Sequence, residues 1–382
     1  TGSGIMLGEI VSERIQSNMP VANENVVPVI EEQSSSEPEE PPLVIIPENT
    51  TIQIIAAGDL MFHIPQIKSA ERENGSYDFS SPFMYIKEYI QHADIAIANL
   101  ETVIAREGEA LKGFPRFNSP PEVLDALKGA GFDILVTANN HTLDRGRSGI
   151  ENTIDQIESR ELDYIGTSKA GRRDFLIREK KGIKIAFFAY TFGLNGLDSL
   201  LTQDELDSMV NLIDKDRIAS SIKDAEADGA EITIIYLHWG NEYQREASQD
   251  QHDLARMLVE NGADLVLGSH PHVVQGFETF EANGNRALVV YSMGNLISNQ
   301  RYETMGVSYT EDGLMISAEI EKNGSTGEVA IKEIIPIATW VHRYESEGRY
   351  EYRIIPVADY LEGKLPLKLP DIKNERVEQS YR

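Results

Sequence analysis

The chain has 382 residues, of which 41% are hydrophobic and 25% are charged, so it is long enough to form one large domain or two ordinary ones around a substantial core. Its 62 acidic and 35 basic residues give a formal net charge of -27, which excludes general binding to nucleic acid because so acidic a chain repels phosphate backbones. The absence of cysteine excludes disulfides, thiolate metal sites and cysteine nucleophiles, and no apolar run approaches the length of a transmembrane helix.

The N-terminal part differs in composition from the rest of the chain. Residues 31–48 read EEQSSSEPEEPPLVIIPE, and a stretch dominated by Pro, Glu and Ser cannot bury enough apolar surface to fold alone. We therefore predict that residues 1–50 are a flexible N-terminal segment and linker. Two interpretations stay open: a stalk that holds a folded domain away from a surface, after a removed signal or anchor, or a plain disordered tail.

From residue 51 onward, short apolar runs alternate with amphipathic patterns of helical period. The apolar runs lack polar alternation, which predicts strands buried on both faces, and they cover residues 51–57, 94–98, 132–137, 231–237, 264–267 and 287–291. Helices are predicted between them at residues 82–92, 121–131, 148–160, 214–228 and 249–261. Strands that alternate with helices of this length predict an α/β domain, which we place at residues 51–312.

Two further segments have strand character. Residues 175–191 predict a hairpin that turns at Lys181-Gly182. Residues 313–382 contain apolar runs that predict mostly strand, at residues 314–320, 328–336 and 350–357. We predict that this part is a C-terminal β-rich extension that completes or caps the domain.

Each of the six apolar runs ends in a polar cluster. In open α/β sheets, ligands bind at the carboxyl ends of the strands, so these clusters are predicted to converge. The candidate side chains are Asp59, Glu101, Asn140, His141, His238, His270 and His272. Carboxylates, an Asn carbonyl and neutral imidazoles suit one or two divalent ions such as Mn, Fe or Zn, and a carboxylate that bridges two ions is typical of a hydrolytic centre.

Each candidate also has an ordinary structural explanation. Asp59 can cap a turn, Glu101 can solvate a loop, and His238 can be a core histidine with satisfied hydrogen bonds. The sequence Asn139-Asn140-His141 is harder to explain in this way, because polar side chains that follow a buried strand are costly without partners. The sharpest signal is His270-Pro271-His272, whose imidazoles can both reach one pocket.

Seven short motifs in a fixed order carry a family resemblance that runs from about Ile52 to Asn299. They are Gly58–Met61, Ala98–Glu101, Ala138–Gly146, His238–Tyr243, Gly262–Asp264, Gly268–His272 and Tyr291–Asn295. This set resembles the CapA family, also called the poly-gamma-glutamate capsule biosynthesis family, which is similar in turn to the calcineurin-like metallophosphoesterases. The resemblance implies a four-layer α/β sandwich in which helices flank two mixed β-sheets.

The same resemblance implies a distribution of metal ligands. One ion would be held by Glu101, Asn140, His238 and His270. The other would be held by Asp59, Glu101 and His272. The superfamily's first motif is Asp-x-His, and Met61 stands at the position of that His, so the second ion would lack one imidazole; His63 is a candidate substitute from the next turn.

The resemblance also implies catalytic roles. His141 would protonate the leaving oxygen or stabilise charge on it, and Asp144 would orient His141. Asp144 could equally cap the helix that begins near Ser148.

Two functions follow as expectations. The first is a metal-dependent hydrolase of capsule or cell-envelope metabolism that acts on a phosphoester or an anionic polymer. The second is a non-catalytic, membrane-tethered accessory subunit that assists poly-gamma-glutamate synthesis or export beside membrane-bound capsule synthase subunits. Both place the chain outside the cytoplasm of a bacterium, anchored through an N-terminal segment that the 382 residues do not contain, and neither involves nucleic acid.

Overall fold

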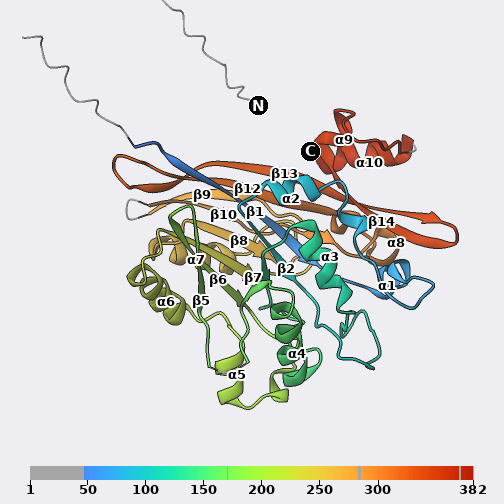
Figure 1. The fold of residues 1–382 in the computed structure, drawn as a ribbon, viewed down its shortest axis with the longest axis horizontal. Helices are drawn as coiled ribbons and strands as arrows, with labels where there is room; N and C mark the ends of the chain where they lie inside the picture. Colours follow the sequence, from blue (N-terminus) through green and yellow to red (C-terminus); the bar gives the residue numbers. More distant parts are fainter. Residues whose placement is uncertain (1–46, 170, 283–284, 370, 382) are drawn as a thin grey trace, which may run out of the picture. The chain divides into compact units, whose positions relative to one another are not determined.

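Two β-sheets form the centre of the protein in the computed structural model (Figure 1). The structure describes residues 47–169, 171–282, 285–369 and 371–381, so the predicted flexible segment 1–50 lies almost entirely outside the described residues. Within the described residues, the first sheet has eight strands and the second has six. Both sheets are mixed and both are covered by helices, which confirms the predicted fold class.

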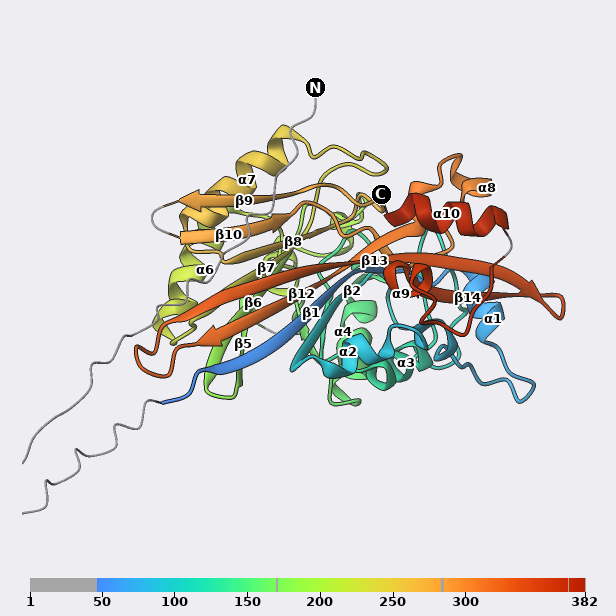
Figure 2. The ribbon, with the colours of Figure 1, turned by 90° about the horizontal axis from the view of Figure 1, so that it is seen from above.

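The first sheet has the strand order β14-β13-β12-β1-β2-β3-β4, and β11 also pairs with β1. Strands β1 to β4 run parallel to one another. Strands β12, β13 and β14 extend the sheet on the other side of β1, and each pairs antiparallel with the strand before it in the sheet (Figure 2). The strands are β1 Thr50–Leu60, β2 Ile95–Leu100, β3 Ile134–Val136, β4 Asp163–Ile165, β11 Asn295–Ile297, β12 Asp312–Lys322, β13 Val329–Ser346 and β14 Arg349–Pro356.

The second sheet has the order β5-β6-β7-β8-β10-β9. Its inner strands β6, β7, β8 and β10 are parallel, and the edge strands β5 and β9 pair antiparallel to β6 and β10. The strands are β5 Phe175–Lys180, β6 Ile183–Thr191, β7 Ile232–His238, β8 Leu265–Ser269, β9 Phe277–Ala282 and β10 Asn285–Val290. Strands β5 and β6 form the hairpin that the sequence predicts at residues 175–191.

Helices cover the outer faces of the sheets. Helices α1 to α5 contribute to the apolar cluster on the first sheet, α6 and α7 pack on the second, and α9 and α10 pack beside β13 and β14 (Figure 1). The helices are α1 Ile64–Ala70, α2 Lys87–His92, α3 Glu122–Ala130, α4 Gly146–Glu158, α5 Gln203–Met209, α6 Lys215–Ala227, α7 Gln249–Glu260, α8 Tyr302–Met305, α9 Val357–Leu361 and α10 Asp371–Tyr381. No helix among the described residues is both long enough and apolar enough to cross a lipid bilayer.

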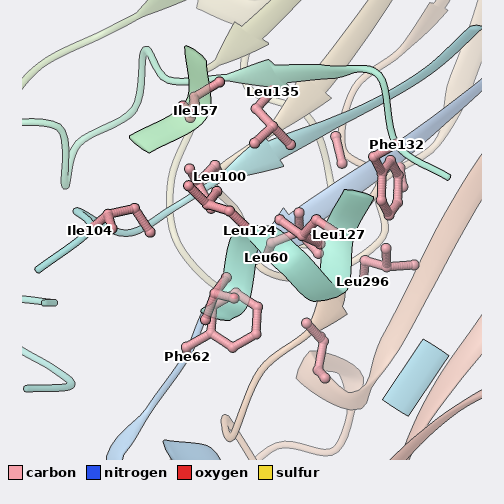
Figure 3. Packing of buried hydrophobic residues seen from close by; sticks show 14 of the residues in the cluster. Leu60, Phe62, Leu100, Ile104, Leu124, Leu127, Phe132, Leu135, Ile157 and Leu296 are labelled. Atoms are coloured by element: carbon pink, nitrogen blue, oxygen red, sulfur yellow. The ribbon is translucent and has the colours of Figure 1, made fainter. Parts of the chain in front are cut away.

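Strand β1 shows why its apolar run does not alternate with polar residues. Successive side chains of a strand point to opposite faces, so both faces of β1 must be apolar when both are buried. Ile54 and Ala56 pack in the core between the two sheets, whereas Ile55 and Ala57 pack against the helix-covered side. Figure 3 shows part of that second core, where Leu124 and Leu127 of α3 lie close to Leu60 of β1.

Three parallel strands begin directly after an aspartate that accepts a hydrogen bond from the backbone N–H of a neighbouring strand. The pairs are Asp94 with Gln53 (3.0 Å), Asp133 with Ala96 (2.8 Å) and Asp264 with Thr233 (2.8 Å). Each carboxylate thereby satisfies a backbone donor at the end of the sheet opposite the carboxyl ends of the strands.

Two predicted elements have different limits in the structure. The predicted helix at residues 82–92 is a short 3-10 turn, Ser81–Phe83, followed by α2, because its hydrogen-bonding pattern breaks around Ile86. The strand predicted to end at Pro336 continues to Ser346. Strand β13 pairs with β14 only from Thr339 onward, so at Pro336 its single neighbour among the described residues is β12. The other side of β13 is a free edge at that point, and an edge tolerates proline although proline has no N–H to donate.

Candidate metal centre

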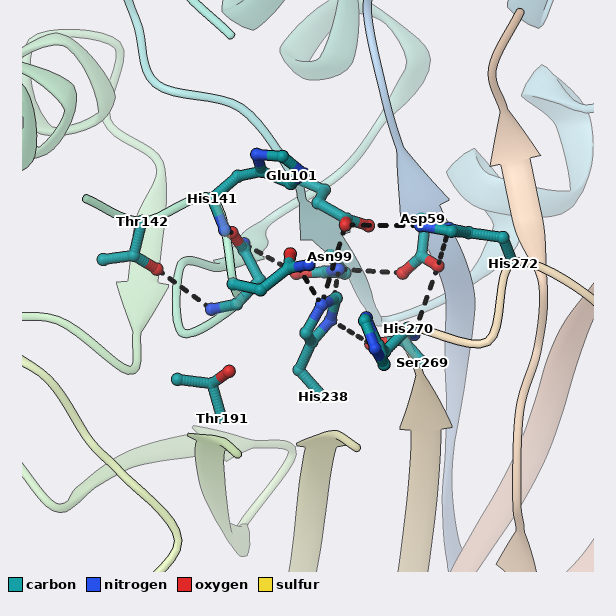
Figure 4. A network of polar contacts seen from close by, with 12 residues as sticks. Asp59, Asn99, Glu101, His141, Thr142, Thr191, His238, Ser269, His270 and His272 are labelled. Atoms are coloured by element: carbon teal, nitrogen blue, oxygen red, sulfur yellow. Dashed lines mark hydrogen bonds and ion pairs between the residues drawn. The ribbon is translucent and has the colours of Figure 1, made fainter. Parts of the chain in front are cut away.

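The polar clusters of the sequence meet where strands of both sheets end (Figure 4). Asp59 lies near the end of β1, Glu101 directly follows β2, and His238 ends β7. The loop after β3 supplies Asn140 and His141, and the turn after β8 supplies His270 and His272. All seven predicted side chains are buried, with at most 4% of their surface exposed.

Glu101 lies at the centre of this cluster. Its Oε1 is 3.6 Å from Nε2 of His238 and 3.7 Å from Nε2 of His272. Neither carboxylate oxygen has a hydrogen-bond partner among the described residues, although the side chain is fully buried. Burial and the neighbouring Asp59 carboxylate raise the pKa of Glu101 well above its ordinary value. The site therefore holds a buried carboxylate without a donor among the described residues.

Asp59 is held in place by its backbone and by its side chain. Its N–H donates to the carbonyl of Gly294 over 2.9 Å, and this approach requires Gly58, because a Cβ at Gly58 would lie 2.0 Å from that carbonyl oxygen. Oδ1 accepts a hydrogen bond from Asn99 (2.8 Å), and Oδ2 lies 3.2 Å from Nδ1 of His272. The carboxylate is thus fixed against one of the imidazoles.

Two other imidazoles are neutral and face Glu101. Burial, reinforced by the neighbouring histidines, lowers the pKa of His238 well below its ordinary value, and burial lowers the pKa of His270 from 6.5 to about 3. Oδ1 of Asn140 lies 3.1 Å from Nε2 of His238. Nδ1 of His270 is buried and makes no hydrogen bond within the described part of the chain. Both rings therefore offer lone pairs rather than positive charge.

The turn that carries His270 and His272 has a strained backbone. Both residues adopt positive φ values, 96° and 56°, in a region that non-glycine residues rarely occupy. Such strain persists only where the surrounding structure imposes it, and it is common at ligand sites. Here it brings two imidazoles that are two residues apart to the same cluster.

His141 lies at the edge of the cluster and is oriented by Asp144. Its Nδ1 is 2.8 Å from Oδ2 of Asp144, and the same oxygen accepts a hydrogen bond from the backbone N–H of Phe117 (2.6 Å). The Phe117 ring packs edge-on against His141 with centroids 4.8 Å apart. Helix α4 begins after Arg145 without a side-chain cap, so the contacts of Asp144 are those of an orienting residue rather than a helix cap.

Met61 and His63 do not complete the set of donors. Met61 is buried and its thioether adds no nitrogen or oxygen. His63 directly precedes α1, and its Nδ1 lies 3.2 Å from Oε1 of Gln66 and 3.3 Å from the backbone N of Asn299. In the part of the chain that the structure describes, none of the candidate donor groups contains His63.

Sequence reasoning left three contributors to the cluster without a role. Asn99 links Asp59 to Asn139, whose side chain donates to Asn99 Oδ1 over 3.1 Å. Asn295 places its Oδ1 3.1 Å from Nδ1 of His272. Glu242 follows β7 in an exposed loop and reaches His270 and His272. All three lie inside the quoted motifs at strand ends, and that position was the available signal.

Among the described residues, three overlapping groups bring their ligand atoms within 4.8 Å of one another. They are Glu101 with His238 and His270, Asp59 with Glu101 and His272, and Glu242 with His270 and His272. The first two groups share Glu101, and Asn140 adds an amide oxygen beside the first. Such a set of carboxylates and imidazoles fits one or two divalent cations.

Comparisons with known proteins agree with this arrangement of motifs. Capsule biosynthesis protein CapA of Bacillus anthracis is 26% identical over 76% of this chain and 68% of its own length. PGA biosynthesis protein CapA of Bacillus subtilis is 26% identical over 73% of this chain and 70% of its own length. A probable polyglutamine synthesis accessory protein of Mycobacterium tuberculosis is 23% identical over 63% of this chain and 66% of its own length.

Among solved structures, the chain is similar to the calcineurin-like phosphoesterase YfkN of Bacillus subtilis, with a TM-score of 0.43, 15% identity, and coverage of 76% of this chain and 91% of that one. It is also similar to the NAD nucleotidase NadN of Haemophilus influenzae, with a TM-score of 0.46, 11% identity, and coverage of 87% and 60%. A sequence model of the family described as bacterial capsule synthesis protein PGA_cap matches residues 53–300. The chain belongs to this family of capsule synthesis proteins, as its motifs predicted.

Proposed function

We propose that the chain is a divalent-metal-dependent hydrolase of the bacterial envelope. The observation that carries this proposal is Glu101, a fully buried carboxylate without a hydrogen-bond donor among the described residues. A buried charge without a partner is strongly destabilising, and protein sites retain one where it binds a cation. The imidazoles of His238 and His272 face the same carboxylate, so a cation there would find ligands on several sides.

The donor chemistry fits the ions expected from the sequence. Imidazole nitrogens with carboxylate and amide oxygens suit Mn, Fe or Zn. One ion would be held by Glu101, Asn140, His238 and His270, and a second by Asp59, Glu101 and His272. A bound ion would lower the pKa of a water molecule and polarise the oxygen of the substrate.

The protein's own residues supply proton transfer. Asp144 binds Nδ1 of His141, which leaves Nε2 on the opposite side of the ring to hold the proton for the leaving oxygen. The backbone N–H of Phe117 fixes Asp144, and the Phe117 ring fixes the plane of the imidazole. His141 would thus act as general acid and Asp144 as its positioning residue.

The substrate and location follow from the relatives. Two relatives are named for biosynthesis of a capsule or of PGA, which supports an anionic envelope polymer, or a phosphoester formed with it, as the substrate class. The same names support an envelope location for the chain. We propose with it an extracytoplasmic site of action, a membrane anchor, and membrane-bound capsule synthase subunits as partners. With a formal charge of -27, the chain would contact a polyanion chiefly through the bound cation.

A second function is favoured by one observation. Met61 leaves the Asp59 side of the site with one imidazole fewer than the calcineurin-like motif implies. A weakened centre is consistent with a non-catalytic accessory subunit that binds polymer or synthase.

The test uses untagged, full-length protein. We expect one or two equivalents of Mn, Fe or Zn by elemental analysis, loss of metal in His270→Ala, and metal-dependent turnover of an aryl phosphate ester. His141→Ala should retain metal but lose about 100-fold or more of kcat, which is the usual contribution of a general acid. Asp155→Asn, an exposed substitution on α4, is the matched control. Metal-free protein that binds poly-gamma-glutamate without turnover would instead establish the accessory function.

A further inference from the structure

The loop after β7 brings an additional carboxylate to the candidate metal centre. Glu242 is exposed, yet its carboxylate and the imidazoles of His270 and His272 have ligand atoms within 4.8 Å of one another. The other two donor groups consist of buried side chains. Glu242 therefore approaches the same histidines from the solvent side.

The loop of Glu242 is anchored to the histidine turn on both sides of that residue. Before Glu242, the N–H of Trp239 donates to the carbonyl of Ser269 over 3.1 Å. After it, the N–H of Tyr243 donates to the carbonyl of Pro271 over 2.8 Å, directly between the two histidines. Because these bonds couple the two segments, Glu242 is held opposite His270 and His272.

The backbone conformation of this loop also depends on specific residues. Gly240 has a φ of 85°, and a Cβ there would meet the buried side chain of Gln251 at 2.8 Å. Gln251 in turn donates to Gln275, which donates to the carbonyl of Gln244 over 2.8 Å. Tyr243 keeps a φ of 64° although it is not glycine. This bracing fixes the loop against the turn that carries the histidines.

Three carboxylates surround the imidazoles of His270 and His272. Glu242 shares His272 with the group of Asp59 and Glu101, and it shares His270 with the group of Glu101 and His238. Carboxylates that lie near one another repel, and an ion bound between them would be attracted to each of them. The unpartnered Nδ1 of His270 and the unpartnered oxygens of Glu101, both noted above for the described residues, are independent signs of a ligand at this place.

We propose that Glu242 is a metal ligand that completes the coordination of the ion beside His272. This inference rests on the proposed metal centre and adds to it a residue and a selectivity. His272 belongs both to the group with Glu242 and to the group with Asp59 and Glu101, so an ion beside it would have mostly oxygen ligands, which suit Mn²⁺. The group around His238 and His270 is rich in imidazole and suits Zn²⁺ or Fe²⁺. The two ions would therefore differ in kind.

The test measures metal binding rather than turnover. Full-length protein freed of metal is titrated with MnCl₂, and bound Mn is counted by elemental analysis and by electron paramagnetic resonance. We expect Glu242→Gln to lower the affinity for one of the bound Mn²⁺ ions by about tenfold or more. Substitution of groups outside the ligand shell already changes metal affinity about 10–100-fold. The affinity for the ion bound beside His238 and His270 should be unchanged.

Glu246→Gln is the matched control, because Glu246 is an exposed carboxylate in the same loop that belongs to none of the candidate donor groups of the described residues. It should bind Mn like the wild type, and both variants should keep the thermal midpoint of the metal-free wild type. Equal Mn affinity of Glu242→Gln and wild type would overturn the role of Glu242. Wild-type protein that takes up no metal at all would overturn the proposed function itself.

Discussion

At the scale of single residues, the buried Glu101 carboxylate lowers the stability of the metal-free protein at the proposed metal site. It is fully buried, its pKa is raised, and it lacks donors among the residues described. In metal-free protein such a group costs free energy at neutral pH, because its charged form is poorly solvated. A cation bound as proposed would offset this cost.

Glu101→Gln should therefore raise the stability of the metal-free protein and abolish its response to metal. The amide has nearly the shape of the carboxylate but carries no charge, so the buried repulsion with Asp59 is lost. Urea unfolding at pH 7 with and without Mn²⁺ measures both effects. A variant that is less stable than the metal-free wild type, or that is still stabilised by Mn²⁺, would contradict the assignment of Glu101.

At the scale of elements, the strands are tied together at both of their ends. Their carboxyl ends carry the candidate centre, and their amino ends carry aspartates that bind the backbone of the neighbouring strand. Asp264, between α7 and β8, is one of these, and burial raises its pKa from 3.8 to about 6. The carboxyl ends of the strands would therefore respond to metal ions, and the amino end that carries Asp264 would respond to pH.

The pH dependence of Asp264 follows from the sign of this shift. The folded state binds the proton more tightly than the unfolded state, so the contribution of Asp264 to stability is complete below about pH 4 and is lost as the pH rises through about 6. Asp264→Asn keeps an acceptor for Thr233 without titrating. The free energy of unfolding of the wild type, relative to this variant, should fall between pH 4 and pH 7; a constant difference would refute the prediction.

The junction between β1 and β11 gives a second prediction at this scale. Gly58→Ala should destabilise the protein by about 1–3 kcal/mol, the usual cost of overpacking, because the new methyl group meets the carbonyl of Gly294. Gly129→Ala is the control, since a Cβ there meets no atom within 4 Å and α3 gains about 0.5–1 kcal/mol from replacing glycine. Urea unfolding of the two variants should shift in opposite directions.

At the scale of the whole molecule, the proposed metal binding would be coupled to folding, because the donors come from both sheets. A ligand present at about 100 times its Kd stabilises the native state by about 2.7 kcal/mol, which for a domain of this size raises the melting temperature by about 4 °C. Calorimetry with Mn²⁺ and then with excess chelator should show this shift and its reversal. An unchanged midpoint would mean that the cluster does not bind the ion.

Much of this arrangement could be predicted from the sequence, because apolar runs that end in polar residues show both the buried strands and the shared edge where those residues meet. The seven predicted site residues lie together for this reason. The motif placed Glu242 near a strand end, but its approach to His270 and His272 could not be predicted, since that depends on left-handed conformations at Gly240 and Tyr243 and on backbone bonds to a distant turn. The extension of β13 past Pro336 was missed because local sequence does not show which side of a strand is an edge.

The hydrogen-bonded pair Asp59 and His272 joins positions 213 residues apart in the sequence. Bringing residues so far apart into contact costs chain entropy, because a loop of that length must close. A nascent polypeptide that ends before residue 272 cannot form this pair, so it has no complete chelating pocket. The protein would consequently bind its metal ion in the compartment where it completes its folding. The metals available in that compartment, rather than those around the ribosome, would then decide which metal it carries.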